Sequence, residues 1–326
     1  MKPAPFSIGT DEAGYGPNLG PLLIAGTVWQ REDAKRQPRV LIRDRQAWGQ
    51  LSKAEKQQHV LVADSKQVYQ SGKIELLERG VLCYLYAVAG TVPRSLEELA
   101  KWVGLPDSVF DQPGFGSEAA MRELALPLAA DVDLIERLGS ELVAGTSTRL
   151  VGVKCRAMFA GEFNDQCDRV GNKASVLSSE TLGLINQLHD QYLPEDFQRL
   201  DVRCDKHGGR SRYAGLLHEN LDICESYPVI LEEGRPLSCY QIPDCNVEIS
   251  FAARGESWLS IALASMFAKY LREIFMLGWN RFWATKVSFP LRPTKGYPVD
   301  AKRFFREIES AMKTQKMDVR SIWRGR

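Results

Sequence analysis

Two adjacent acids, Asp11 and Glu12, end the first apolar run of the chain and are its clearest sign of chemistry. A glycine-dense turn follows at residues 14–20, and a second apolar, β-rich run begins at Leu22. This pattern predicts a strand, a tight functional turn and a second strand. Because an unpaired buried charge is costly, two carboxylates at the inner end of a strand predict a compensating cation. We therefore interpret Asp11 and Glu12 as half of a divalent-metal site.

Two further acids occupy similar positions later in the chain. Asp205 follows the strand-like run Phe197–Cys204, and Glu256 directly precedes Ser257–Phe282, the most apolar helical stretch. Each acid has an ordinary explanation on its own: a loop carboxylate beside basic residues, and a favourable interaction with a helix dipole. Four acids at the ends of core elements are more than those explanations predict, so we group the two pairs as one candidate site.

The donors of this candidate site are all carboxylate oxygens. Such donors, without histidine or cysteine, suit Mg²⁺ or Mn²⁺. Two such ions about 4 Å apart can activate a water molecule and stabilise the leaving oxygen in phosphodiester hydrolysis. That chemistry needs no side-chain nucleophile, which is consistent with the absence of a GxSxG motif and of a recognisable Cys/His pair.

The composition indicates a folded protein with a sizeable core, with 326 residues, 44% of them hydrophobic and 25% charged. The net charge is +1, so any nucleic-acid surface must be local, in basic stretches such as Lys206–Arg212. No apolar run approaches the roughly 20 residues that span a bilayer, and the N-terminus lacks a signal-peptide pattern. Seven cysteines without a CxxC pair favour a reducing cytoplasm, with each cysteine a small buried apolar residue.

Strand and helix signals alternate irregularly, which predicts an α/β protein with a mixed sheet flanked by helices. Further strands are predicted at Val81–Ala89, Leu150–Phe159 and Phe197–Cys204, with short strands within 223–251. Helices are predicted at Tyr69–Arg79, Asn172–Tyr192, Ser257–Phe282 and Asp300–Met312. We expect one domain over 1–326, with a helical insertion at 91–148 and a helical, basic C-terminal segment at 290–326.

Several stretches resemble motifs of the ribonuclease HII and HIII family, and they occur in the order found in that family. The opening motif of the family has an Asp-Glu pair before a GRG or GKG turn; residues 11–21, DEAGYGPNLGP, resemble it. The remaining matches are Asp64–Lys66 to its DSK motif, Glu162–Asn164 to its EID segment, Gly255–Glu273 to its acid and AASILAK helix, and Lys295–Pro298 to its GYP motif. The resemblance covers nearly the whole chain except about 90–148 and 212–240.

The resemblance implies a ribonuclease H-like fold and a function. The implied function is metal-dependent endonucleolytic hydrolysis of the RNA strand of RNA–DNA hybrids by two metal ions, leaving 3′-hydroxyl and 5′-phosphate ends. By position, the implied catalytic and metal-binding carboxylates are Asp11, Glu12, Asp205 and Glu256, with Mg²⁺ or Mn²⁺ as cofactor. Glutamate at the fourth place resembles the HIII branch, whereas the N-terminal extension domain of that branch has no counterpart here.

Residues that would contact the substrate also follow from the resemblance. They are the turn residues Gly14, Tyr15 and Gly16, together with Ser65, Lys66 and Tyr297, and the accessory candidates are His207 and Lys269. Backbone groups of the turn would read the ribose 2′-hydroxyl. Position 15 departs from the family, because a tyrosine replaces its arginine or lysine. Tyrosine cannot hold a phosphate as a cation does, although it can stack or donate one hydrogen bond.

Two alternatives stay open at this point. The first is a nuclease of the same fold with a shifted nucleic-acid substrate, because of Tyr15 and the inserted segments. The second is a nucleic-acid-binding protein that has lost turnover, although a pure binder has no need of four acids. In each case we expect a cytoplasmic monomer whose partner is nucleic acid, with no membrane and no haem or nucleotide cofactor.

Overall fold

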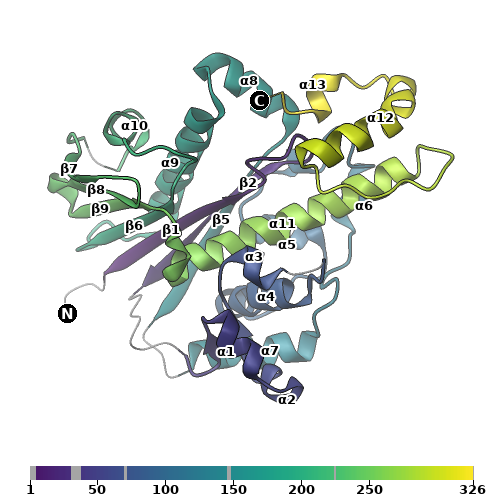
Figure 1. The fold of residues 1–326 in the computed structure, drawn as a ribbon. Helices are drawn as coiled ribbons and strands as arrows, with labels where there is room; N and C mark the ends of the chain where they lie inside the picture. Colours follow the sequence, from purple (N-terminus) through teal and green to yellow (C-terminus); the bar gives the residue numbers. More distant parts are fainter. Residues whose placement is uncertain (1–4, 31–37, 70–71, 145–147, 224, 326) are drawn as a thin grey trace.

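A seven-stranded mixed sheet forms the centre of the protein, in a computed structural model that describes all residues except 1–4, 31–37, 70–71, 145–147, 224 and 326 (Figure 1). The strand order is β5-β2-β1-β6-β9-β8-β7. Their bounds are β1 Phe6–Ala13, β2 Leu22–Gln30, β5 Arg149–Met158, β6 Leu200–Asp205, β7 Val229–Glu233, β8 Leu237–Ile242 and β9 Val247–Ala252. Strands β1, β6 and β9 are parallel, and the other neighbours pair antiparallel. The predicted mixed sheet is therefore confirmed.

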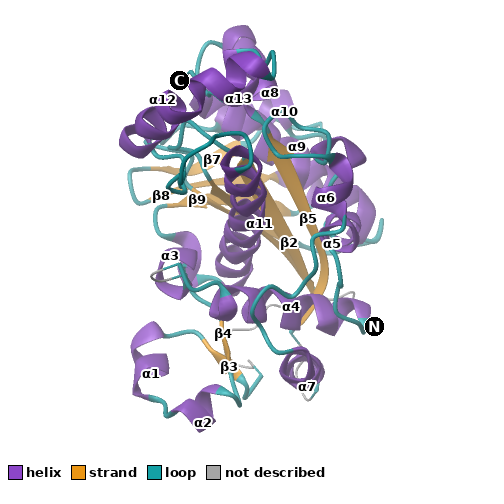
Figure 2. Cartoon of the chain, turned by 90° about the vertical axis from the view of Figure 1, so that its right-hand side faces the viewer, coloured by secondary structure: helices purple, strands orange, loops and turns teal. Residues whose placement is uncertain are grey.

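Helices cover both faces of this sheet (Figures 1 and 2). On one side lie α8 Ala160–Val170, α9 Lys173–Tyr192 and α10 Ala214–Asn220, and on the other α11 Leu259–Ala284 with α4 Glu75–Ala89 beyond it. Successive side chains of a strand point to opposite faces. In β2, Leu23 and Ala25 accordingly join the core around α11, whereas Ile24 and Val28 join the core around α9. Burial on both faces explains why β2 reads as a continuous apolar run.

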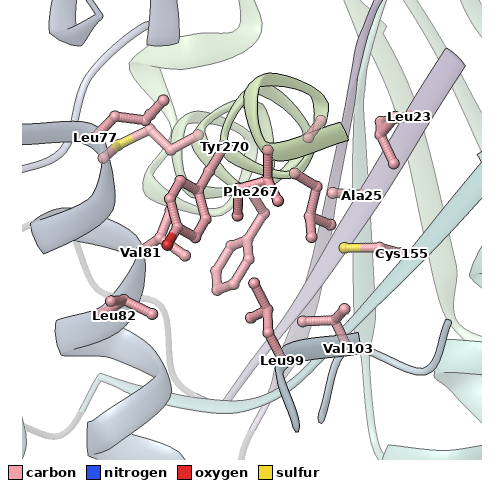
Figure 3. Packing of buried hydrophobic residues seen from close by; sticks show 14 of the residues in the cluster. Leu23, Ala25, Leu77, Val81, Leu82, Leu99, Val103, Cys155, Phe267 and Tyr270 are labelled. Atoms are coloured by element: carbon pink, nitrogen blue, oxygen red, sulfur yellow. The ribbon is translucent and has the colours of Figure 1, made fainter. Parts of the chain in front are cut away.

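The larger core fills the space between α11, α4 and the sheet (Figure 3). Phe267 and Tyr270 of α11 lie between Val81 on α4 and the sheet residues Ala25 and Cys155 (Figure 3). All five side chains are nearly inaccessible to solvent. Full burial of a large apolar side chain such as Phe267 stabilises a fold by about 1.5–3 kcal/mol. This core therefore fixes α11 firmly against β1 and β2.

One strand prediction was wrong, because Val81–Ala89 belongs to helix α4. Residues Leu77–Leu85 are buried without interruption, so the segment shows neither the alternation of a strand nor the stripe of a surface helix. Periodicity cannot distinguish a fully buried helix from a buried strand. The predicted helix Tyr69–Arg79 is likewise displaced: α3 spans Ser65–Val68 and α4 begins at Glu75, with 70–71 outside the described residues.

The segment 91–148 is helical where the structure describes it, with α5 Leu96–Trp102, α6 Glu118–Arg122 and α7 Val132–Val143. The helical structure of this segment is broken between α6 and α7. Glu78 of α4 fixes this break, because its carboxylate accepts hydrogen bonds from the backbone N–H groups of 128–130 at 2.6–2.7 Å and from the Tyr270 hydroxyl at 2.6 Å. That this segment is an insertion stays a prediction.

Replacing Glu78 by alanine should therefore destabilise the protein strongly. Glu78 is fully buried, and its loss would leave three backbone donors and one hydroxyl without partners. We expect the free energy of unfolding to fall by roughly 3 kcal/mol or more in urea denaturation. The control is Glu75→Ala, an exposed acid on the same helix, which should change it by about 0.5 kcal/mol or less. Equal effects of the two substitutions would contradict this account.

The remaining elements lie around this frame. They are β3 Leu41–Ile42 and β4 Val60–Leu61, which pair in a small parallel sheet, α1 Arg45–Gln50, α2 Lys53–Lys56, α12 Pro298–Thr314 and α13 Val319–Ile322, and three short 3₁₀ turns at Asp107–Val109, Pro243–Cys245 and Gly255–Ser257. Within the described residues, no helix combines the length and apolar character needed to cross a bilayer. Cys245 is disulfide-bonded, so the expectation that every cysteine is a small buried thiol was wrong there.

Candidate metal and nucleic-acid site

The predicted acids lie together at the C-terminal ends of the parallel strands β1, β6 and β9, in the middle of the sheet. Thr10 pairs with Cys204, so the next residues, Asp11 and Asp205, lie side by side. Strand β9 ends at Ala252, and the turn Gly255–Ser257 then carries Glu256 to the start of α11. Asp205 Oδ1 accepts a hydrogen bond of 3.2 Å from the Gly255 backbone N–H, which joins this turn to β6. Parallel pairing thus brings together acids that are far apart in the sequence.

Burial and mutual repulsion act on the first two acids. Asp11 is 8% exposed, and burial together with the charges of Glu12 and Asp205 raises the pKa of its carboxyl group well above the ordinary value. Burial and the charges of Asp205 and Glu256 raise the pKa of Glu12 to about 8, against the opposing effect of Lys66. The two acids and Asp205 therefore act on one another electrostatically.

The other two acids belong to the same electrostatic cluster. Burial, followed by the charge of Asp64, raises the pKa of Asp205, and burial followed by Asp205 and Asp64 raises that of Glu256. Burial lowers the pKa of Lys66, but the attraction of the surrounding acids outweighs it and the net shift is upward. None of the four predicted acids forms an ion pair within 4.0 Å of a cation in the described residues. The cluster therefore carries an excess of negative charge that a cation would relieve.

The acids are close but do not form a ready coordination shell. Among the residues that the structure describes, no group of three or more His, Cys, Asp or Glu side chains is arranged to hold a metal ion. Alternation along β1 gives one reason, because adjacent side chains leave opposite faces of a strand. Ser265 of α11 lowers the pKa of Asp11, whereas the charge of Glu12 acts on Tyr15 and Cys204 near the α9 side. The donor chemistry fits Mg²⁺ or Mn²⁺, but ligation requires side-chain rotation.

Two residues of this site, Asp64 and Ser265, were not assigned a role from the sequence. Asp64 caps α3, accepting from the Lys66 backbone N–H at 3.0 Å, and its charge acts on Asp205 and Glu256 as a fifth acid. The Ser265 hydroxyl donates to the Ser65 hydroxyl at 3.0 Å, and Ser265 lowers the pKa of Asp11 against the larger effect of burial. The DSK pattern was a signal for Asp64, whereas nothing in the local sequence pointed to Ser265. Ser65 is thereby enclosed behind the acids, while Lys66 is exposed beside them.

The glycine turn is held from two distant parts of the chain. Arg324 Nη2 donates a hydrogen bond of 2.6 Å to the Gly14 carbonyl, and Asn18 exchanges two hydrogen bonds of 2.8 Å with the Arg324 backbone. The Asn18 backbone N–H also donates to the Gly296 carbonyl at 2.8 Å, within the GYP stretch. Arg324 is fully buried, and burial together with Arg272 lowers its pKa to about 9. The turn is therefore a rigid surface beside the acids.

Alanine at position 14 should disturb this turn far more than alanine at position 16. Gly14 has φ +93°, and an added Cβ would lie 2.5 Å from Arg272 Nε and 2.5 Å from the Pro21 carbonyl oxygen. We expect Gly14→Ala to lower the free energy of unfolding by about 2 kcal/mol or more in urea denaturation. A Cβ at Gly16 meets no atom within 4 Å, so Gly16→Ala is the matched control with a small effect. Similar losses for both variants would refute the packing described for this turn.

Tyr15 projects from the turn toward α9 and the loop after β6. It is half-buried, and burial and the charge of Glu12 raise its pKa. Lys173, the first residue of α9, places its ammonium nitrogen 4.8 Å from the centroid of the Tyr15 ring. A cation thus lies beside the position where the family resemblance leads one to expect an arginine or lysine. Sequence reasoning missed Lys173, because 158 residues separate it from Tyr15 and only the packing of α9 on the sheet joins them.

The loop after β6 is more enclosed than expected. His207 is 2% exposed, its Nδ1 lies 2.9 Å from the Ser178 hydroxyl, and burial followed by Arg210 lowers its pKa to about 3. A neutral, enclosed imidazole favours a packing role over the accessory role predicted for it. Lys206 Nζ donates to the Gly234 carbonyl at 2.8 Å and to the Ser238 hydroxyl at 2.9 Å. The prediction of a phosphate-binding surface along this basic stretch is therefore wrong at Lys206.

The remaining predicted residues lie along α11 and the GYP stretch. Lys269 pairs with Glu273, and its ammonium nitrogen lies 4.7 Å from the centroid of the Tyr69 ring. The Tyr69 hydroxyl donates to Glu273 at 2.7 Å, which ties the end of α3 to α11. Tyr297 is 55% exposed, so its ring is free to stack on a ligand. The catalytic, metal-binding and substrate-binding roles of all these residues stay predictions.

Comparison with known proteins gives likenesses in structure. No model of a protein family matches the chain, and no curated protein matches its sequence. Ribonuclease H2 from Pyrococcus horikoshii OT3 is similar over 97% of this chain and 92% of its own, with 15% identity and a TM-score of 0.43. RNase HII from Archaeoglobus fulgidus, in a complex with PCNA, is similar over 97% and 93%, with 14% identity and a TM-score of 0.43. Bst-RNase HIII in complex with Mn²⁺ is similar over 99% and 67%, with 12% identity and a TM-score of 0.40. At these identities the likeness concerns the fold.

Proposed function

We propose that this protein is a divalent-metal-dependent endonuclease that hydrolyses the RNA strand of RNA–DNA hybrids. One observation carries the proposal: Asp11, Glu12, Asp205 and Glu256 come from three distant segments and repel one another at the C-terminal ends of the parallel strands. Maintaining such repulsion costs stability, and proteins keep strained, like-charged sites mainly where they bind or react. The clustering of the acids does not identify the substrate. The choice of an RNA–DNA hybrid rests on the resemblance of the opening, turn, DSK and GYP motifs to those of the ribonuclease HII and HIII family.

Each group would have a distinct task in this reaction. The four carboxylates would hold Mg²⁺ or Mn²⁺, which when bound supplies a Lewis acid and an activated water to the scissile phosphate in a two-metal arrangement. Lys66, exposed beside the acids, would bind a phosphate oxygen by charge-assisted hydrogen bonds. Backbone groups around Gly14 and Gly16 would contact the ribose 2′-hydroxyl, which distinguishes RNA from DNA. Tyr297 would stack on a sugar or base.

A cleavage assay with Mg²⁺ or Mn²⁺ tests the proposal. The substrates are a labelled RNA–DNA hybrid, a DNA duplex containing one ribonucleotide, and an all-DNA duplex. Cleavage of ribonucleotide-containing duplexes to 5′-phosphate ends, dependent on Asp11 and Asp205, would support it. Cleavage of the DNA duplex alone would select the same-fold nuclease with a shifted substrate, and binding without cleavage under every metal would select a nucleic-acid-binding protein that has lost catalysis.

A further inference from the structure

A strongly basic pocket lies between α1, α2, α3 and α4, outside the acid cluster. Its volume is about 470 Å³. Five of its lining residues are basic and one, Glu75, is acidic; the basic residues are Arg45, Lys53, Lys56, Lys73 and Arg79. The nearby acids of the two short helices are engaged elsewhere, because Asp44 caps α1 and Glu55 forms the capping box of α2. The pocket therefore has a large local excess of positive charge in a protein whose net charge is only +1.

Arg79 at the base of this pocket distinguishes it from a cluster of exposed surface lysines. It is 4% exposed, and its guanidinium carbon lies 5.2 Å from the centroid of the buried Trp48 ring. In the part of the chain that the structure describes, its guanidinium forms no hydrogen bond and no ion pair within 4.0 Å. Burial lowers the pKa of Arg79. Its donors are therefore available to a ligand in the pocket, and the planar guanidinium matches the geometry of a phosphate.

The pocket is close to the acid cluster. Arg43, just before α1, donates to the carbonyl oxygens of Glu256 at 2.9 Å and of Ser257 at 3.1 Å. Arg45, which lines the pocket, donates to the Gln67 carbonyl on α3 at 3.2 Å. On the same short helix, Lys66 faces the acids while Val68 lines the pocket. Two residues of one short helix therefore line the two sites.

We propose that this pocket, lined by α1, α2, α3 and α4, binds a backbone phosphate of the nucleic-acid strand that reaches the acid cluster. Helix α3 borders both sites, and successive phosphates of one strand lie about 3.4 Å apart along a duplex axis, so a strand bound at the acids would bring a neighbouring phosphate to the pocket. Arg79 would donate to the phosphate from below, and Lys53 and Lys56 would neutralise it from the rim. That the ligand is a nucleic-acid strand rests on the proposed function. That the pocket binds phosphate rests only on its basic side chains.

The first experiment measures binding without cleavage. Affinity for a labelled RNA–DNA hybrid is titrated against KCl in Ca²⁺, for the wild type and for Lys53→Gln/Lys56→Gln, which changes only rim residues. We expect roughly tenfold weaker binding and a salt slope smaller by about one to two units. The control Lys286→Gln, at the far end of α11, should leave both unchanged. An unchanged affinity and slope in the double variant would overturn the proposal.

The second experiment separates the pocket from the proposed nuclease. Thermal unfolding of the wild type is measured with inorganic pyrophosphate, which stabilises a protein that binds it. Two results together support a phosphate site on the bound strand. Arg79→Lys and Lys53→Gln/Lys56→Gln should each reduce the stabilisation by pyrophosphate, and the double variant should bind the hybrid more weakly. Stabilisation by pyrophosphate with no effect of the rim variant on hybrid binding would identify a site for a free phosphate compound and overturn the strand assignment. If neither probe binds in the pocket, the site itself is refuted, whatever the protein cleaves.

Discussion

Asparagine in place of Asp11 should abolish hydrolysis and at the same time make the metal-free protein more stable. The carboxylate of Asp11 is buried and repelled by Glu12 and Asp205, so removing its charge relieves a penalty in the folded state. The amide keeps the size of the side chain. If the proposed function holds, the loss of one metal ligand should reduce cleavage roughly 10³-fold, which a standard assay registers as abolished hydrolysis.

The two effects are measured on the same preparations. Thermal unfolding in EDTA should give a midpoint higher by at least about 2 °C for Asp11→Asn, and Asp205→Asn should move in the same direction. Added Mg²⁺ should stabilise the wild type more than either variant, because only the intact cluster binds it well. The matched control is Asp201→Asn, which lies on the same strand as Asp205 but pairs with Arg199 at 2.7 Å. Loss of stability in Asp11→Asn would show that the acid has a structural role instead.

Glu12 should make the metal-free protein less stable as the pH rises. Its pKa is about 8 in the folded protein, against 4.5 as the ordinary value that an unfolded chain approaches. The folded state therefore holds a proton that the unfolded state has lost between these two values. The stability that this proton contributes is fully present below about pH 4.5 and is lost as the pH rises through about 8. We therefore expect deprotonation of Glu12 to make the free energy of unfolding lower at pH 9 than at pH 6.

Urea denaturation in EDTA at a series of pH values measures this dependence. Glu12→Gln, which cannot ionise, should flatten the curve between pH 6 and pH 9. Glu55→Gln is the control, because Glu55 is exposed and its hydrogen bonds lower rather than raise its pKa. A wild-type curve that is already flat, or one that Glu12→Gln leaves unchanged, would mean that the charge cluster is weaker than the geometry indicates. Saturating Mg²⁺ should also reduce the slope, since a bound cation favours the ionised carboxylate.

Local sequence was sufficient for the elements that carry the acids. The strand ending at Asp11 and Glu12, the strand ending at Asp205, and the long helix after Glu256 lie where the apolar runs, turns and caps predict them. Strand β5 and helix α9 were also predicted within one or two residues of their observed bounds. These signals are local, because alternation, helical spacing and capping involve residues that are close in the chain.

Contacts between distant residues decided the rest. The Val81–Ala89 stretch was mistaken for a strand because Leu77–Leu85 is buried on every side, which removes the periodicity that identifies a helix. Lys206 turned inward because the β7–β8 hairpin offers it acceptors, and Lys173 and Arg324 reached the glycine turn across 158 and 310 residues of chain. The sequence by itself thus determined which acids could do chemistry and which elements they end. Only the tertiary structure decided their spacing, the cations beside them and the basic pocket, because pairing and packing bring together residues whose relation has no local pattern.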